Sequence, residues 1–293
     1  MANNIAAGIG EKFSAVLQTE LYESYVWAFI SNTKFEGDFV GNDTVHFPRY
    51  TKLTVSDLAS SYDTLTTEDV VLTDETFVLD IRKAGSYKIS DEDYIEMKVS
   101  PDSELIMSMK DAFANSYDTE IMKEYANAGY TLDDGDMTTA TNWGAGNPII
   151  LAKGNVYDMV TAAVQIMDEN NIPAADRFLV ISPKERRLLN NAPELLRSTS
   201  MGDRIVTWGF MWDIDGVNIF YSNNLQTVTG TKHALAWQGK PISFAANIRP
   251  SITFVDSSTI KDEFVNYVKA QTKFGVKTFN EGAIKLLDVQ VSA

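Results

Sequence analysis

The 293-residue chain contains no cysteine and only two histidines, His46 and His233. The absence of cysteine excludes disulfides, thiolate metal sites and a cysteine nucleophile. Neither histidine has a second histidine near it in sequence, so both are interpreted as ordinary polar side chains rather than metal ligands. We therefore expect no metal site and no cofactor.

Long apolar runs are also missing. No window approaches the roughly 20 apolar residues that span a bilayer, and residues 1–10 lack the cationic and apolar regions of a secretory signal. We expect a soluble protein that has no membrane partner.

Basic residues are scarce, with 25 Lys and Arg against 40 Asp and Glu, so the formal net charge is −15. A protein whose main role is to neutralise nucleic-acid phosphates needs clustered Lys and Arg, and this charge balance argues against that class. An acidic charge also keeps many proteins soluble, and solubility alone explains the value equally well.

Motifs with catalytic spacing are not found. The acidic run 133–136 lacks the loop spacing and closing Glu of an EF-hand, and Gly144-Ala145-Gly146 is not followed by the Lys-Ser or Lys-Thr of a phosphate-binding loop. Ser182 has no flanking glycines, so it fails as a nucleophile elbow and is predicted to cap the next helix instead. We expect a protein that is not an enzyme and has no catalytic residue.

The N-terminal segment 6–29 has a helical pattern. Its apolar residues recur at three- and four-residue steps, as one face of a helix requires: Ile9, Phe13, Val16, Leu17, Leu21, Tyr25 and Phe29. The polar residues that follow offer nothing to cover this face. The pattern predicts an amphipathic arm that docks on another lobe or another subunit.

Residues 44–88 show the alternation of a β-hairpin. The first strand is predicted at Val45, Phe47, Leu53 and Val55, and the second at Val70, Leu72, Phe77, Leu79 and Ile81. The segment 56–69 between them has the polar composition of a loop. Because a two-stranded ribbon is only marginally stable in water, it needs a partner surface along its flank.

A long helix is predicted from Ser100 to Asn127. Ser100 is a suitable cap, Pro101 fits the first helical position, and no Gly or Pro interrupts the next residues. At 1.5 Å per residue the helix would be about 40 Å long. Its predicted stripe is Leu105, Met109, Ala112, Phe113, Ser116, Met122 and Tyr125.

The remaining pattern is mixed, and the fold class is therefore predicted as α+β. A loop is expected at 131–148, and helices are expected at 156–170 and 183–190. Strands are expected at 177–182, 206–211, 217–221 and 234–237, with further strands in the tail 254–291 that return to the long helix.

Several segments together resemble the major capsid proteins of tailed phages, which share the Hong Kong 97 type capsid fold. The strongest resemblance lies in Asn147-Pro148-Ile149-Ile150, Met167-Asp168-Glu169-Asn170-Asn171-Ile172-Pro173 and Arg177-Phe178-Leu179-Val180-Ile181-Ser182-Pro183. Gly209 with 215–223, and 89–93 with Asp118, are similar to further parts of that family.

This resemblance implies a division of the chain into five parts. The N-terminal arm would be 1–34, and the extended β-hairpin loop 35–89. The peripheral domain with its spine helix would be 90–154, the axial domain 155–246, and 247–293 would return to the peripheral domain. The sequence shows no recognisable N-terminal scaffolding extension, which would leave control of assembly to a separate scaffolding protein.

The resemblance implies a capsid protein that self-assembles into pentamers and hexamers of an icosahedral head, is built in the host cytoplasm and is located in the virion. Its partners would be other capsid subunits, a scaffolding protein, a portal and possible decoration proteins, with double-stranded DNA enclosed without sequence-specific binding. The candidate intersubunit contacts are Phe13, Leu17, Leu21, Tyr25, Val45, Phe47, Leu53, Val70 and Leu72.

Two other hypotheses remain open. An encapsulin-like compartment would share the fold and enclose a cargo enzyme in place of DNA. An ordinary soluble enzyme is the third reading, for which the residue inventory offers no support.

Overall fold

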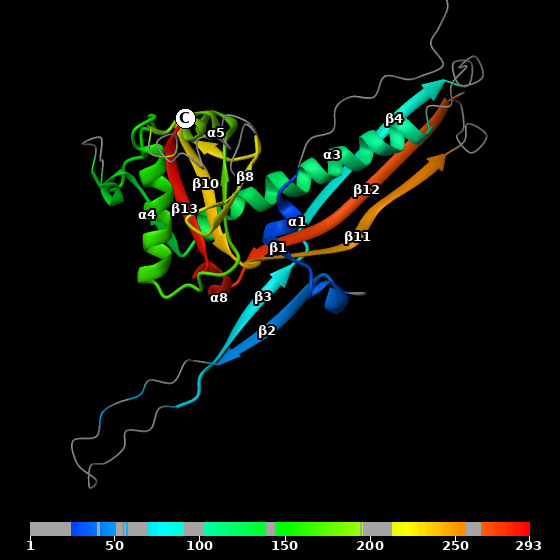
Figure 1. The fold of residues 1–293 in the computed structure, drawn as a ribbon. Coiled ribbons are helices and arrows are strands. Elements are labelled where there is room, and N and C mark those ends of the chain that lie inside the picture. The colour runs from blue at the N-terminus through cyan, green and yellow to red at the C-terminus, as the bar shows by residue number, and fades with distance from the viewer. Residues whose placement is uncertain are drawn as a thin grey trace, which may run out of the picture.

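The fold is α+β, as predicted, and contains an elongated four-stranded sheet, a seven-stranded sheet and a projecting hairpin (Figure 1). The structure is a computed structural model that describes residues 25–39, 42–50, 55, 57, 69–90, 102–138, 144–193, 195, 213–255 and 265–293.

The four-stranded sheet is built around two long antiparallel strands, β11 (Ile242–Val255) and β12 (Val265–Thr278). The edge strand β4 (Ile81–Ser90) pairs antiparallel with β12, and the short β1 (Ser31–Asn32) pairs parallel with β11. In the tail 254–291, the predicted return to the long helix is confirmed for β12, whose Thr272 hydroxyl lies 2.7 Å from the Tyr117 hydroxyl of that helix.

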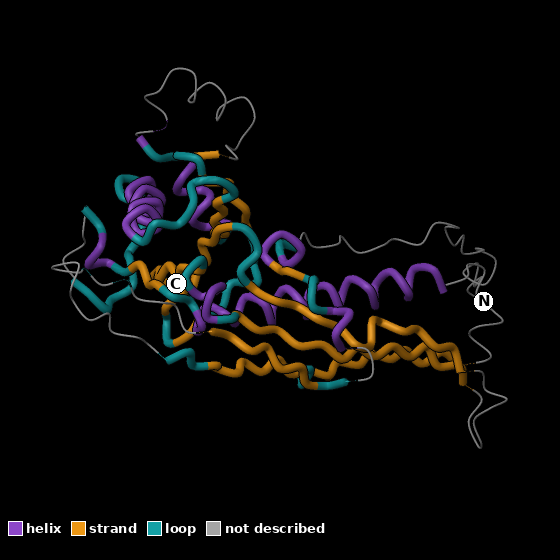
Figure 2. Tube along the Cα trace, turned by 90° about the horizontal axis from the view of Figure 1, so that it is seen from below, coloured by secondary structure: helices purple, strands orange, loops and turns teal. Residues whose placement is uncertain are grey.

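The predicted spine is present as α3 (Asp102–Met122), which continues into the 3-10 helix η3 (Lys123–Asn127). Figure 2 shows α3 running along the four-stranded sheet. Among its side chains from Met107 onward, the buried ones are Met109, Phe113, Tyr117, Asp118, Ile121 and Met122. Ala112, predicted on this stripe, is exposed, and the predicted cap Ser100 lies outside the described residues.

The seven-stranded sheet forms the second lobe together with α4 (Val156–Glu169) and α5 (Pro183–Asn190). Its strands run in the order β5 (Tyr130–Leu132), β13 (Leu286–Ser292), β10 (Thr231–Gln238), β6 (Arg177–Ile181), β8 (Val217–Tyr221) and β7 (Asp213–Ile214), with β9 (Thr227–Val228) on β10. A short helix, α8 (Asn280–Ala283), precedes β13.

Most elements of this lobe follow the predicted pattern, including α4, β6, α5 and β8. Ser182 caps α5 as predicted: its Oγ accepts from the Glu185 backbone N–H at 3.4 Å, and the Glu185 carboxylate accepts from the Ser182 N–H at 2.8 Å. The strand predicted at 206–211 lies outside the described residues.

The prediction of a continuous loop at 131–148 is wrong. β5 and the 3-10 helix η4 (Asp134–Asp136) occupy its first part. β5 has only three residues and forms because it pairs in parallel with β13, more than 150 residues later. Local periodicity in the sequence does not predict a pairing between such distant segments.

The predicted hairpin is present as β2 (Thr44–Tyr50) paired antiparallel with β3 (Leu72–Val78). The prediction of one second strand running through Leu79 to Ile81 is wrong. The chain leaves the hairpin after Val78, and β4 begins at Ile81 with β12 as its partner. Alternation continues across the junction because both segments are strands, so the pattern does not reveal the change of partner.

The helical pattern predicted for 6–29 falls largely outside the described residues. Within them, the helix α1 covers only Trp27–Ile30, and Tyr25 and Val26 precede it outside the helix. A further 3-10 helix, η2, lies at Glu36–Phe39.

The five-part division of the chain remains a prediction. Strand pairing is informative for three of its parts. β4, inside the predicted loop region, belongs to the four-stranded sheet, while β5 and β13, inside the predicted peripheral parts, belong to the seven-stranded sheet.

Candidate intersubunit surfaces

The N-terminal segment is held on the spine by Asp118, a fully buried carboxylate on α3. Its Oδ1 accepts hydrogen bonds from the backbone N–H groups of Val26 and Trp27, both at 2.9 Å. Its Oδ2 accepts from Ser222 Oγ at 3.2 Å and from Asn224 Nδ2 at 3.0 Å. One side chain therefore joins the arm, the spine and the loop after β8.

Tyr25, a predicted intersubunit contact, has a partner within its own chain. Its hydroxyl donates to Asp111 Oδ1 at 2.6 Å, and the neighbouring Trp27 packs edge-on against Tyr117 with 5.8 Å between ring centroids. The contact role of Tyr25 stays a prediction. The other predicted arm contacts, Phe13, Leu17 and Leu21, lie outside the described residues.

The base of the hairpin packs into a small aromatic core of its own. Phe39 and Phe77 are fully buried with ring centroids 5.0 Å apart, and Leu79 and Ala245 complete the buried cluster. Partly buried residues surround them: Phe35, Val45, Phe47 and Phe279. At its base, the partner surface that the ribbon needs is therefore supplied by the same chain, where Val45 and Phe47 pack on this core. The intersubunit role of these two residues stays a prediction.

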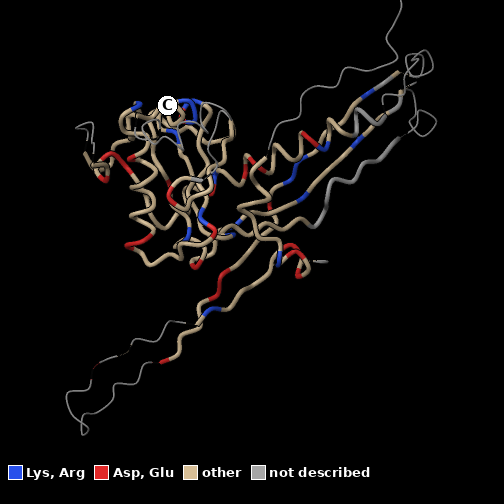
Figure 3. Tube along the Cα trace, in the orientation of Figure 1, with Lys and Arg blue, Asp and Glu red and all other residues tan. Residues whose placement is uncertain are grey.

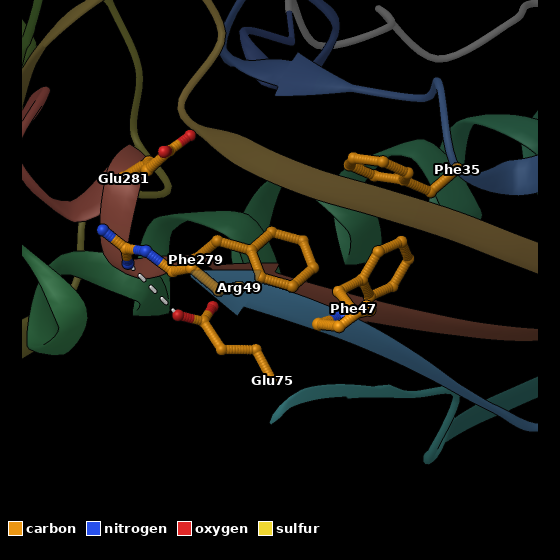
Figure 4. A pocket seen from close by; sticks show the side chains of 7 residues that line it. Phe35, Phe47, Arg49, Glu75, Phe279 and Glu281 are labelled. Atoms are coloured by element: carbon orange, nitrogen blue, oxygen red, sulfur yellow. Dashed lines mark hydrogen bonds and ion pairs between the residues drawn. The ribbon is translucent and has the colours of Figure 1, made fainter. Parts of the chain in front are cut away.

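A hollow of about 250 Å³ opens beside this core (Figure 4). Phe35, Phe47 and Phe279 form its apolar wall, and Arg49 pairs with Glu75 across β2 and β3 at 3.3 Å between Nη1 and Oε1. Sequence patterns gave no indication of Phe35 and Phe279, because they reach the hairpin from segments about 240 residues apart.

Beyond its base the hairpin exposes apolar side chains. Val70 is 78% exposed, Leu72 is 56% exposed and Tyr50 is 69% exposed. Figure 1 shows this part of the hairpin extending away from both sheets. Leu53, also predicted as a contact, lies outside the described residues.

The hairpin crosses β12 at Gly275. A Cβ placed there would lie 2.3 Å from the Val78 carbonyl oxygen, so only glycine allows this approach of the two backbones. Nearby, Lys277 Nζ donates to the Thr76 carbonyl at 2.5 Å, and Lys273 pairs with Asp43. The hydrogen bond from Lys273 holds the pKa of the exposed Asp43 carboxyl below its usual value.

His233 forms a buried pair with Asp288, with Nδ1 at 3.0 Å from both carboxylate oxygens. The Tyr125 ring from η3 stacks on the imidazole with 3.8 Å between centroids. Burial raises the pKa of the Asp288 carboxyl, and His233 opposes the shift. The other histidine, His46, contacts Asp74 across the exposed hairpin at 2.6 Å. Among the described residues, no group of three or more metal-ligating side chains converges.

The acidic and glycine-rich motifs of 133–146 hold each other in place. Asp133 accepts from the backbone N–H groups of Gly135 at 2.8 Å and Gly146 at 2.6 Å, and Asp134 accepts from Gly144 at 3.2 Å. Gly144 and Gly146 both have positive φ, which glycine adopts without strain. These carboxylates stabilise a loop.

Solved structures with the same arrangement include chains from phages. A chain of Mycobacterium phage Che8 superposes with a TM-score of 0.79 at 18% identity, covering 98% of both chains. The capsid structure of cyanophage P-SCSP1u gives 0.78 at 14% identity, covering 100% of this chain and 95% of that chain. The mature capsid of bacteriophage PhiM1 gives 0.72 at 13% identity, covering 97% and 92%.

The chain has the Hong Kong 97 type phage capsid fold. The match extends over both sheets, the spine and the hairpin, and it confirms the fold expected from the sequence resemblance. Neither the protein-family models nor the sequences of curated proteins match this chain. In the described part of this capsid fold, no helix combines the length and apolar character needed to cross a membrane.

Proposed function

We propose that this chain is the major capsid protein of a tailed phage, which assembles into pentamers and hexamers of an icosahedral head around double-stranded DNA. The observation that carries the proposal is the capsid fold itself, matched over nearly the full length of the chain and of its structural neighbours. The likeness to assembled capsids supports a role in a homo-oligomeric shell.

The projecting hairpin supports a role in contacts between copies. Val70 and Leu72 are apolar and exposed on a two-stranded ribbon, a structure that needs a further surface for stability. In this proposal the two side chains, with Leu53, contact a neighbouring subunit, and so does the arm face of Phe13, Leu17, Leu21 and Tyr25. Val45 and Phe47 are proposed as contacts too, and they also anchor the hairpin base.

The proposed protein is assembled in the host cytoplasm and ends in the virion. Its proposed partners are a separate scaffolding protein, a portal and decoration proteins. Packaged DNA is enclosed without sequence-specific binding. In this proposal the role of the chain is structural and not catalytic.

Electron microscopy of the purified chain tests the proposal. The expected result is closed shells with pentameric and hexameric units, with or without a co-expressed scaffolding protein. A compact particle that stays monomeric at high concentration would contradict it. Shells that co-purify with a cargo enzyme instead of DNA would identify an encapsulin-like compartment, an alternative that no feature of this chain favours.

A further inference from the structure

Basic residues are concentrated in the four-stranded sheet of this acidic chain. The paired strands β4 and β12 contain no Asp or Glu, although the whole chain carries a net charge of −15. Figure 3 shows Lys and Arg along these strands. The two strands contain six basic residues: Arg82, Lys83, Lys88, Lys269, Lys273 and Lys277.

The contacts of α3 show which side of the sheet each residue occupies. Tyr117 on α3 bonds Thr272 at 2.7 Å, and Tyr87 bonds Ser108 on α3 at 3.0 Å. Side chains alternate along a strand and cross-strand partners share a side. All of the basic residues except Lys83 therefore lie on the side opposite α3. We call this the basic face: Arg82, Lys88, Lys269, Lys273 and Lys277.

Among the residues that the structure describes, the hairpin covers one end of the basic face. Lys273 and Lys277 contact Asp43 and Thr76 near the hairpin base, whereas Arg82, Lys88 and Lys269 are exposed. Between the two regions lies a hollow of about 420 Å³, lined by Arg82, Lys83, Lys273, Gln271, Thr272, Ala84 and Asp43. Two of its cationic side chains, Arg82 and Lys273, belong to the basic face and stand against one carboxylate, Asp43, which is a lining suited to an anionic group. Lys83 points to the α3 side, where it pairs with Glu120.

The cations of the basic face lie close together. Arg82 is directly opposite Lys273 in the β4–β12 register. The ammonium groups of Lys269 and Lys88 lie 4.7 and 5.8 Å from the centroid of the same Tyr267 ring. Like charges placed opposite each other destabilise a sheet, so an added anionic surface would lower the free energy of this arrangement.

We infer that the basic face docks the carboxylate-rich surface of a second copy of this chain. Two copies of net charge −15 repel each other, and this repulsion opposes any close assembly. The repulsion becomes attraction only where the cationic face of one copy meets the carboxylates of another. This inference rests on the proposed shell function and deepens it by assigning a contact. The phosphates of DNA are the competing anion, and they fit less well with a chain that is acidic elsewhere.

The test compares two charge-reversal variants with equal change in net charge. Arg82→Glu with Lys269→Glu reverses the exposed part of the basic face. Lys153→Glu with Lys184→Glu reverses two exposed lysines of the other lobe and is the control. Arg82→Gln with Lys269→Gln removes the charge without reversing it and is less demanding for folding. Circular dichroism and the Tm of each variant establish that it is folded.

Assembly is measured by sedimentation at low and high salt. The expected result is that the wild type forms shells at low salt, that the basic-face reversal raises the concentration needed for assembly at least tenfold, and that the neutral variant falls between. Salt above about 0.5 M is expected to reduce the difference between the wild type and the neutral variant, because it screens exposed charges.

Three results would overturn the inference. The first is that the basic-face variants assemble like the wild type. The second is that the control variant loses assembly to the same extent, which would show that net charge alone causes the effect. The third is that assembly is unchanged while salt-dependent binding of the wild type to duplex DNA is lost in the variants, which would assign the face to nucleic acid. A wild type that never forms shells would instead refute the proposed function.

Discussion

At the scale of single residues, Asp118 is the side chain on which the position of the N-terminal arm depends most directly. It accepts two backbone and two side-chain hydrogen bonds while fully buried on α3. Its carboxylate satisfies donors that would otherwise be buried without a partner, and each such donor costs about 1 to 3 kcal/mol.

Replacing Asp118 by alanine is therefore expected to lower the free energy of unfolding by about 3 kcal/mol or more, because several buried donors lose their acceptor together. Urea denaturation of the dissociated subunit, followed by circular dichroism, measures the change. Glu169→Ala, at the exposed end of α4, is the control and should change the value by less than about 0.5 kcal/mol. Equal effects of the two substitutions would show that Asp118 has no special role.

A second residue-scale prediction concerns pH and Glu120. Partial burial raises the pKa of this carboxyl, but hydrogen bonds from Lys123 and Lys83 outweigh the burial and hold the pKa below its usual value. The unfolded state therefore takes up the proton first as pH falls. The stabilisation from Glu120 is complete above the unfolded pKa and is lost as pH falls through the folded pKa.

Glu120→Gln should be less stable than the wild type at neutral pH and should lose less stability between about pH 6 and pH 3. Chemical denaturation at a series of pH values tests this. Glu169→Gln, which removes an exposed carboxyl on α4, should leave the pH dependence close to that of the wild type. Parallel curves for the wild type and Glu120→Gln would contradict the assignment.

At the scale of elements, the hairpin depends on one close backbone contact with the four-stranded sheet. At Gly275 the position of an added Cβ is 2.3 Å from the Val78 carbonyl oxygen and 3.0 Å from side-chain carbons of Leu79 and Phe77. A carbonyl oxygen cannot move aside as a flexible side chain can, so β3 would have to shift as a whole.

Gly275→Ala is expected to destabilise the subunit by about 1 to 3 kcal/mol, the usual cost of overpacking. Gly85→Ala is the matched control on the neighbouring strand, because its Cβ would meet only Met109 Cε at 3.7 Å. Thermal unfolding compares the two. A lower Tm for Gly275→Ala alone supports the crossing, and an unchanged Tm for both would show that the hairpin is not held there.

The elements were predictable to the extent that their signals are local. The spine, α4, α5, β6 and β8 follow from periodicity and capping residues, and Ser182 caps α5 as its neighbours suggest. Pairing partners were not predictable. β5 forms through β13, and the strand pattern that continues from β3 into β4 passes between two sheets.

For the candidate contacts too, local pattern was informative and long-range contacts were not predictable. Alternation identified Val45, Phe47, Val70 and Leu72 as one apolar pattern, although the first two turn towards the aromatic core of their own subunit and the last two are exposed. The difference arises because Phe35 and Phe279, which are distant in sequence, cover the hairpin base. The alternation of apolar residues within the hairpin does not predict these contacts.

At the scale of the whole molecule, the subunit combines a well-packed body with surfaces that its own residues leave uncovered. Val70 and Leu72 contribute little to the stability of an isolated subunit because they are exposed in it. If they are buried between copies, each would contribute about 1.5 to 3 kcal/mol to assembly. Assembly would then raise the apparent stability of every subunit by mass action.

The double substitution Val70→Ser with Leu72→Ser separates the contribution to subunit stability from the contribution to assembly. The Tm of the dissociated subunit should stay close to that of the wild type, while the subunit concentration needed for shell formation should rise more than tenfold, since about 1.4 kcal/mol corresponds to a factor of ten. Val228→Ser with Ile284→Ser, which replaces two exposed apolar residues outside the hairpin, is the matched control and should assemble as the wild type does. Sedimentation and electron microscopy over a range of concentrations measure both pairs. Normal assembly of the hairpin variant would mean that the exposed side chains of the hairpin are not the contact between copies.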